Sequence, residues 1–316
     1  MERRDVLMIR DGALAAGLSF FLYKLTSSAT FFIIPLLLAA PRLIDAKRAL
    51  LPIAAVLILL LGDSLIGLKG VFADTVLAVL LLVGLYMPVS LLVGAACWIG
   101  LAKRRMLIRF LYGSIFAAIG GFLLIIWFRS GSEAAGQAGD SLKNMYVVIA
   151  DTFITSALPV GLNSEMLFTI MVAIVESAYL PIFMVQFGLS VMASELFIHR
   201  TDWEYQKRMS KWRLPANAVW AFLGGWTMVL ATTVIKLPLF VATAWNLALT
   251  VSLLYFVQGI SIVAYLVRKR NERISATRMF ILMFVTTLVP GINVILFTAL
   301  PLLGVSETWI RYRVNE

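Results

Sequence analysis

Long apolar stretches, separated by short polar segments, run through almost the whole chain. Most are close to the roughly 20 residues that a helix needs to cross the hydrocarbon core of a bilayer. The pattern therefore predicts an all-α fold, a polytopic transmembrane helix bundle of about nine spans. The predicted spans are approximately 13–25, 30–43, 50–65, 73–102, 107–128, 166–198, 216–235, 239–267 and 279–305.

Residues 129–165 interrupt this pattern with a polar segment that combines Gly with Ser, Glu, Gln and Asp. Within it, apolar residues recur every three or four positions over 142–157, which predicts an amphipathic helix. We expect this helix on the outer face, along the headgroups or capping the bundle. The chain then divides into a five-span N-terminal bundle over 1–128, this extracytoplasmic segment, and a C-terminal bundle over 166–316.

The last apolar segment, 279–305, is broken by Pro290-Gly291 and has two interpretations. As a single crossing, it has a suitable length and leaves Arg311 and Arg313 outside. As a re-entrant hairpin, it has two short arms and returns both arginines to the inside. Hydrophobic length favours the crossing and the distribution of positive charge favours the hairpin, so both alternatives stay open.

Basic residues set the orientation of the predicted bundle. Twenty of the 27 Lys and Arg residues fall in five short clusters. The clusters lie at 1–11, 42–48, 103–109, 200–213 and 268–278. Because cytoplasmic loops retain Lys and Arg, we expect these clusters and the N-terminus on the cytoplasmic face. Membrane orientation and contact with anionic headgroups then account for the net charge of +10, and no nucleic acid is expected as a partner.

Composition narrows the function classes further. The chain of 316 residues is 61% hydrophobic with a mean hydropathy of +0.93, which leaves no room for a sizeable soluble domain. A single cysteine, Cys97, excludes an intramolecular disulfide, and the single histidine, His199, excludes a histidine-rich metal centre. The sequence has no Walker A motif and no nucleophile–base grouping. We therefore expect no enzymatic activity, no metal and no cofactor.

Glu176 is the clearest ionisable residue inside a predicted span. Inserting a charged side chain at the centre of a transmembrane helix costs about 2.5–3.5 kcal/mol, so we expect Glu176 to have a structural or functional role. Tyr179 shares its helix face, and Pro181 frees a backbone carbonyl nearby. One interpretation is a substrate, cation or proton site that faces the bundle interior. The other is a glutamate, protonated or paired with a lysine, that locks two helices together.

Three amides complete the candidate substrate site between spans six, eight and nine. Asn246 and Gln258 lie in the eighth span, and Asn293 follows the break in the ninth. Such side chains contact ligands, or they hold helices together through hydrogen bonds of about 0.6–2 kcal/mol. Broken backbone at membrane depth is either buried in protein or lines a cavity.

Two further groups are candidates for docking a partner protein. The first contains small residues of the first span, whose spacing also suits close internal helix packing. The second contains aromatic and basic residues of the inner loop, which are also typical of a membrane interface. Together the candidates are Ala13, Ala16, Gly17, Trp203, Trp212 and Arg213.

Short motifs in the C-terminal third carry a family resemblance. They are Trp212-Arg213-Leu214-Pro215, Asn246, Gln258-Gly259, and Leu303-Gly304-Val305-Ser306-Glu307-Thr308-Trp309 with Arg313. On these residues the chain resembles the YybS-like family of bacterial polytopic membrane proteins, a domain of unknown function. Glu307 stands where that family usually has Asp. The resemblance implies a multi-pass protein of the bacterial cytoplasmic (inner) membrane and no particular activity.

The small-residue run 12–17 is similar in style to the substrate-binding components of energy-coupling-factor vitamin transporters, in which a comparable face docks the partner. Two functional hypotheses follow. The favoured one is a small-solute-binding or transport subunit that works with a partner ATPase or an ion gradient. The alternative is a non-transporting scaffold for cell-envelope or division factors, recruited through the inner loop 199–213 and the outer amphipathic helix.

Overall fold

A computed structural model describes residues 3–25, 29–43, 46–67, 75–153, 163–270, 276–287 and 289–313. Helices make up most of these described residues, and none of them lies in a strand. The all-α prediction is therefore confirmed, while the number of nine spans stays a prediction. The chain forms two compact units, with unit 1 at Met1–Ser194 and unit 2 at Glu195–Glu316.

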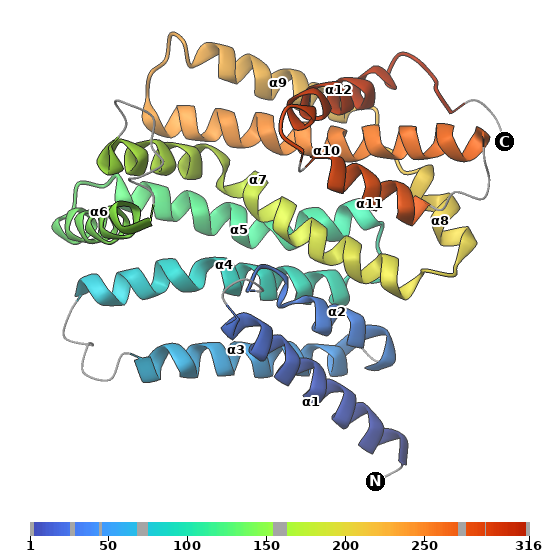
Figure 1. Ribbon diagram of the computed structural model, residues 1–316, viewed down its shortest axis with the longest axis horizontal. Helices are drawn as coiled ribbons and strands as arrows, with labels where there is room; N and C mark the ends of the chain where they lie inside the picture. The colour runs from blue at the N-terminus through green and yellow to red at the C-terminus, as the bar shows by residue number, and fades with distance from the viewer. Residues whose placement is uncertain are drawn as a thin grey trace. The chain divides into compact units, whose positions relative to one another are not determined.

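Unit 1 contains six long helices and a short helical segment between the first two (Figure 1). Its elements are α1 Arg3–Lys24, η1 Ala29–Phe31, α2 Ile34–Ala39, η2 Ala40–Leu43, α3 Ala46–Gly67, α4 Thr75–Gly100, α5 Met106–Phe128, α6 Glu133–Phe153 and α7 Ser164–Ile198. The last turn of α7 belongs to unit 2. The predicted start of the fourth span, at residue 73, lies outside the described residues.

An aromatic side chain of α7 occupies the contact between α4 and α5. The Phe187 ring is completely buried, and a Cβ on Gly94 or Gly113 would come within 3.1 Å of it. These two glycines therefore provide the space for the ring. Phe187 also stacks on Phe110 of α5, with ring centroids 5.5 Å apart. Small residues opposite a large ring are a common way to pack helices closely.

Helix α6 begins earlier than the predicted amphipathic helix. The predicted start is residue 142, whereas α6 starts at Glu133, and the predicted end at 157 lies outside the described residues. Glycines at 136 and 139 lower helix propensity and obscured this first part. Two factors offset them: the Ser132 hydroxyl accepts the Ala135 N–H at 3.3 Å, and Ala135 is buried where α6 packs on α4 and α5.

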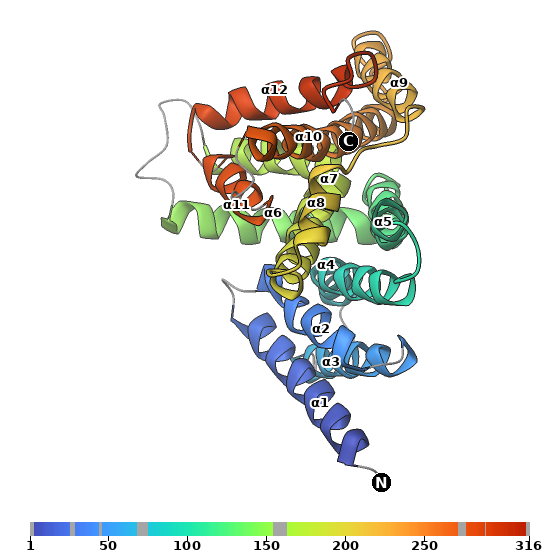
Figure 2. The ribbon, with the colours of Figure 1, turned by 90° about the vertical axis from the view of Figure 1, so that its right-hand side faces the viewer.

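Unit 2 is built around one long central helix. Its helices are α8 Trp203–Ser210, α9 Ala218–Ala231, α10 Pro238–Arg270, α11 Ala276–Thr287 and α12 Ile292–Ser306. Helix α10 contacts each of the other four (Figure 2). Gly225 of α9 allows one of these contacts to be close, because its Cβ would lie 3.0 Å from the Cα of Ala248.

Within the described residues, five helices are long and apolar enough to cross a membrane. They cover Lys47–Ile66, Val79–Gly100, Met106–Phe128, Ser164–Ile198 and Pro238–Arg270. Shorter apolar helices occupy Ile34–Leu43, Ala218–Ala231, Arg278–Thr287 and Ile292–Ser306. Large apolar side chains such as Trp220 and Leu230 lie exposed on helix surfaces. Hydrocarbon rather than water is the solvent that suits such a surface.

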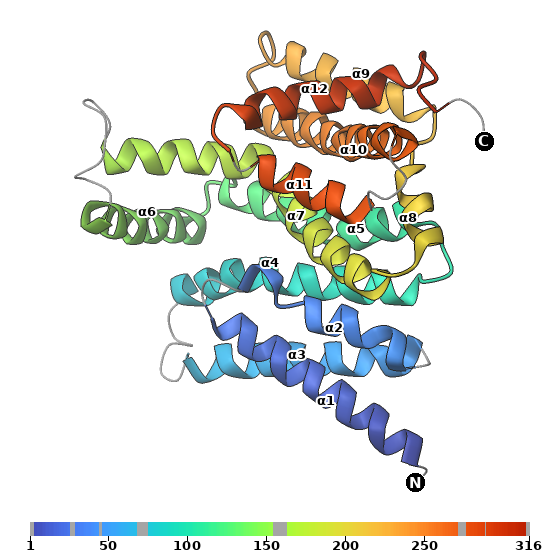
Figure 3. The same cartoon turned by 45° about the vertical axis from the view of Figure 1, so that its right-hand side comes forward.

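Helices α11 and α12 form the two arms of a helical hairpin that packs on α10 (Figure 3). Gly291, with a φ of +85°, precedes α12 in a conformation that favours glycine. After α12 the chain returns to the segment before α9, where the Arg313 side chain donates to the Ser210 carbonyl at 3.1 Å. A re-entrant hairpin over 279–305 would likewise return the chain, after its second arm, to the face at which its first arm begins.

Candidate functional site

Residues from the sequence motifs of the C-terminal third meet around the Gln258 side chain. Gln258 is buried in α10, and its Oε1 accepts the N–H of Leu214 at 2.8 Å. Its Nε2 donates to the Gly304 carbonyl at 3.0 Å and to Glu307 Oε2 at 2.9 Å. One amide thus joins three segments that are far apart in sequence.

Glu307 and Arg313 form a buried, bidentate ion pair beside this amide. Arg313 Nε lies 2.7 Å from Glu307 Oε1 and Nη2 lies 2.6 Å from Oε2. The two side chains are only 4% and 8% exposed, respectively. Arg313 Nη1 also donates to the carbonyls of Ser210, at 3.1 Å, and Trp212, at 2.9 Å. Charge-assisted bonds of this geometry are among the strongest that proteins make.

Ser261 connects α10 to the same carbonyls. Its Oγ lies 3.0 Å from the Met209 carbonyl and 2.9 Å from that of Trp212, and it accepts from Arg313 Nη1 at 3.2 Å. Because a hydroxyl has one proton, it donates to one carbonyl at a time. We name Gln258, Ser261, Glu307 and Arg313, with the backbone they bind over 209–214, the C-terminal clamp.

Two glycines of the same motifs allow α10 and α12 to cross closely. A Cβ on Gly259 would overlap the carbonyl of Leu300, and one on Gly304 would overlap that of Tyr255. Each helix therefore rests directly on the backbone of the other. This close approach brings the end of α12 to Gln258.

The clamp fixes the base of a short amphipathic segment. We name residues 203–213, which comprise α8 and the turn after it, the basic platform. Within it, Gln206, Met209 and Ser210 are buried. Its exposed residues include Trp203, Lys207, Arg208, Lys211 and Arg213. Apolar and polar contacts thus hold one face, while these cations are exposed.

Asp202, the residue just before the platform, is the N-cap of α8. Its Oδ1 accepts the Tyr205 N–H at 3.0 Å, which satisfies one of the orphan donors at the helix start. This hydrogen bond, together with His199 nearby, lowers the pKa of Asp202. His199 itself stacks on Tyr205 with ring centroids 4.2 Å apart. The platform is therefore anchored at its start as well as at its end.

Glu176, the leading candidate of the substrate site, forms an ion pair with Arg129. Arg129 Nη2 lies 2.5 Å from Glu176 Oε2, and Nε lies 3.1 Å from Oε1. Glu176 is 16% exposed and Arg129, the C-cap of α5, is 42% exposed. The geometry is that of a lock between α5 and α7, with an arginine in the place where the sequence suggested a lysine. Arg129 was missed because it lies 47 positions away.

The other candidate substrate residues also bond to protein groups. Tyr179 donates to the Ala118 carbonyl at 3.0 Å, within unit 1. In unit 2, buried Asn246 donates to the Ala242 carbonyl at 2.8 Å, and Asn293 Oδ1 accepts the Val294 N–H at 2.8 Å. Their ligand-binding role remains a hypothesis, and in the structure each makes a hydrogen bond within the protein.

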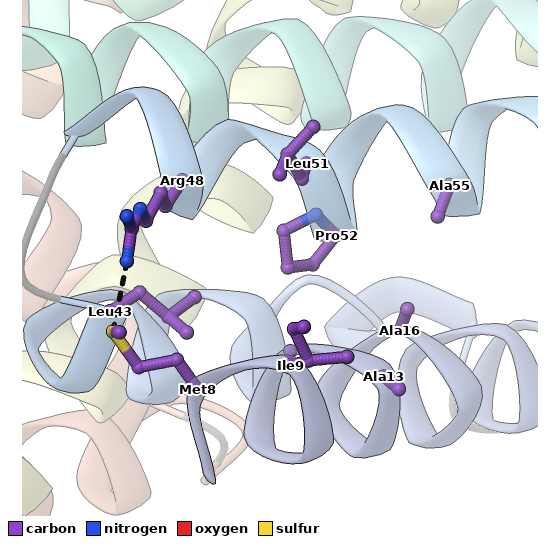
Figure 4. A pocket seen from close by; sticks show the side chains of 10 residues that line it. Met8, Ile9, Ala13, Ala16, Leu43, Arg48, Leu51, Pro52 and Ala55 are labelled. Atoms are coloured by element: carbon purple, nitrogen blue, oxygen red, sulfur yellow. Dashed lines mark hydrogen bonds between the residues drawn. The ribbon is translucent and has the colours of Figure 1, made fainter. Parts of the chain in front are cut away.

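The predicted docking residues fall at two places. Ala13 and Ala16 line an apolar groove between α1 and α3, whereas Gly17 is not among its lining residues (Figure 4). Trp203, Trp212 and Arg213 belong to the basic platform. The carbonyl of Trp212 also accepts a hydrogen bond from Arg313 of the clamp.

Comparisons with known proteins agree with the membrane character of the helices. A family model described as predicted membrane protein (DUF2232) matches residues 15–305, which is most of the chain. No curated protein and no solved structure matches the chain. The YybS-like resemblance and the similarity to energy-coupling-factor components are not confirmed by these comparisons.

Proposed function

The chain belongs to the DUF2232 family of predicted membrane proteins, and we propose that this integral membrane protein is a non-transporting scaffold. Its site is the basic platform, which docks an acidic segment of a partner protein at the cytoplasmic surface of a bacterial inner membrane. Cell-envelope or division factors are the class of partner that the scaffold hypothesis suggests.

The C-terminal clamp is the observation that supports this proposal. Its side chains bind the carbonyls of Ser210 and Trp212 and the N–H of Leu214, so hydrogen bonds fix the backbone at the end of the platform. A docking surface that is ordered before binding loses less conformational entropy when the partner arrives. Motif residues that hold a surface segment in place fit a scaffold better than a solute site.

The charge of the platform specifies the partner chemistry. Lys207, Arg208, Lys211 and Arg213 are exposed cations, and Trp203 adds an exposed aromatic surface. Trp and Arg are enriched among residues that dominate binding energy. An acidic partner would be attracted over distance, with association that weakens at high salt. The positive-inside rule favours the cytoplasmic face for this cluster.

One observation favours the transport hypothesis as a second candidate. The backbone break at Pro290-Gly291 is followed at Ile292 by the start of α12, and transporters present half-helix ends to solutes at such breaks. In this candidate the solute contacts residues of one unit, either Glu176 and Tyr179 in unit 1 or Asn246, Gln258 and Asn293 in unit 2, and a partner ATPase or an ion gradient supplies the energy.

Site-specific photo-crosslinking in cells tests the scaffold. A photoreactive amino acid replaces Trp203 in one variant and exposed Lys103, in the loop between α4 and α5, in a matched control. We expect an adduct with an acidic protein at 203 and none with that protein at 103. Changing Lys207, Arg208, Lys211 and Arg213 together to Gln should abolish the adduct.

Two control variants separate the candidates. Neutralising Lys103, Arg104 and Arg105 to Gln removes charge elsewhere and should leave the adduct at 203 intact. Glu176→Gln should also leave it intact. An adduct that persists after the platform is neutralised would contradict the scaffold. A stoichiometric small metabolite that co-purifies with the wild type and is lost in Glu176→Gln would favour transport instead.

A further inference from the structure

We propose that the groove between α1 and α3 is a binding site for one anionic phospholipid. An acyl chain would lie between the two helices, and the phosphate would contact the Arg48 guanidinium. This site lies in unit 1, away in sequence from the platform, and the inference does not depend on the proposed scaffold function.

The groove follows from two helices that run in the same direction. Met8 Sδ accepts from Arg48 Nη1 at 3.7 Å at one end, and a Cβ on Gly12 would lie 3.2 Å from Pro52 Cγ one turn further on. Beyond these contacts, Ala16 and Ala55 continue the two walls. Figure 4 shows the two rows of side chains facing each other across the space.

The groove is large because the residues that face it are small. Gly12, Ala13 and Ala16 contribute little volume from α1, which leaves about 580 Å³ between the helices. Nine of the ten lining residues are apolar, and the exception is Arg48. Apolar cavities far smaller than this one hold apolar ligands such as benzene. A lipid chain is the apolar ligand that the surrounding bilayer supplies.

The charge at one end of the groove selects the headgroup. Arg48 is exposed at the end where Met8 lies, and Figure 4 shows its guanidinium turned toward that end. Exposed Arg42 and Lys47 adjoin other residues at this end in sequence, as does Arg10, which pairs with Asp11 at 3.2 Å. Arginine binds phosphate with two parallel hydrogen bonds, and basic pockets between membrane helices hold anionic headgroups. The opposite end has the neutralising pair Lys24–Asp63.

Charge at the rim makes a lipid a better occupant than a helix. A partner transmembrane helix would have to bring a group that suits the exposed Arg48 side chain to that end of the groove. An anionic phospholipid brings both parts, the apolar chain and the phosphate, in one molecule. The groove therefore matches an anionic phospholipid along its whole length.

Native mass spectrometry of the full chain, released from detergent with phosphatidylglycerol or phosphatidylcholine added, measures the binding. We expect one phosphatidylglycerol to be retained in preference to phosphatidylcholine. Arg48→Gln should weaken phosphatidylglycerol binding about fivefold, as expected for one basic residue, and leave phosphatidylcholine unchanged. Arg104→Gln, which removes an exposed arginine outside the groove, is the matched control.

Groove-filling variants test the position of the acyl chain. Ala13→Phe places a ring in the groove and should abolish retention, whereas Leu18→Phe, on an exposed position of α1 outside the groove, should not. A phosphatidylglycerol with a photoreactive acyl chain should label peptides that contain Ala13 or Ala55 in the unmodified protein. This labelling does not depend on whether the variants fold.

Three outcomes would overturn the proposal. Equal retention of the two lipids would show that the groove belongs to the general lipid annulus. Labelling only at residues outside α1 and α3 would place the lipid elsewhere. Dimers or a partner helix that are lost in Ala13→Phe, without a change in lipid retention, would assign the groove to a protein contact.

Discussion

The two units use ion pairs in opposite ways. In unit 1, the cations of the pairs Lys24–Asp63 and Arg129–Glu176 lie at helix ends and are 49% and 42% exposed. In unit 2, Glu307–Arg313 is almost fully buried and shares its atoms with Gln258, Ser261 and two backbone carbonyls. An ion pair therefore joins two helices at a solvent-accessible position in unit 1, whereas in unit 2 it is part of a buried network that fixes the backbone over 209–214.

The physical reason is the cost of removing a charge from solvent. An exposed pair contributes about 0–1 kcal/mol, since solvent solvates either partner when the other is lost. A buried pair contributes little compared with apolar side chains of similar size, but removing one partner leaves an uncompensated charge. The clamp should therefore respond sharply to single substitutions, and the pairs of unit 1 should not.

The largest expected effect is at Arg313. Arg313→Gln leaves the Glu307 carboxylate buried without its cation and should lower the unfolding free energy of unit 2 by about 3–5 kcal/mol. Thermal unfolding in mild detergent, followed by tryptophan fluorescence, measures the change. Arg311→Gln, on an exposed neighbour, should stay within about 0.5 kcal/mol. Replacing both Glu307 and Arg313 with Leu should recover most of the loss, and a double variant as unstable as the single one would contradict the account.

The glycine contact between α10 and α12 comes next. Gly259→Ala forces a methyl group against the Leu300 carbonyl and should cost about 1–3 kcal/mol. Gly224→Ala in α9 meets no heavy atom within 4 Å, so it should stabilise the helix by about 0.5–1 kcal/mol. The same unfolding measurement should thus give opposite signs for the two substitutions. Destabilisation by both substitutions would show that the effect at Gly259 is not specific to the close crossing of α10 and α12.

Glu176→Gln should have a smaller effect. The variant keeps the shape of the side chain and removes the charge opposite Arg129, which is partly exposed, so the expected loss of stability is about 1 kcal/mol or less. Asp140→Asn, at an exposed position of α6, is the control. A loss of several kcal/mol would mean that the pair resembles the clamp, and the contrast between the units would fail.

The smallest effect should be at Lys24–Asp63. A double-mutant cycle of Lys24→Gln and Asp63→Asn should give a coupling of about 0.2–1 kcal/mol that decreases as salt is raised. The cycle is read from unfolding curves at low and high ionic strength. A coupling that is independent of salt would indicate a pair that solvent does not reach.

Sequence patterns predicted the helices better than the contacts between them. Hydrophobic runs located the five long apolar helices, because each run is a local property of about 20 residues. The start of α6 was missed because its glycines lower the helix propensity of a segment that the Ser132 cap and buried alanines stabilise. Local propensity does not report packing of that kind.

The clamp was beyond prediction for a related reason. Gln258 was a candidate for ligand binding, and Glu307 and Arg313 were only members of a motif. Leu214 lies 44 positions from Gln258, so no periodicity links them. An acidic and a basic residue just after the last apolar helix were the available signal, but solvated charges give the same pattern at most helix ends.

The central claim is that the basic platform and the segment after α12 lie on one face of the membrane, joined by the clamp. Single cysteines at exposed Lys211 and Arg311, introduced in a Cys97→Ser background, test it directly. A thiol reagent that does not cross lipid should label both Lys211→Cys and Arg311→Cys in inside-out vesicles and neither in right-side-out vesicles. Labelling of Arg311→Cys in right-side-out vesicles, while Lys211→Cys stays protected there, would contradict the account.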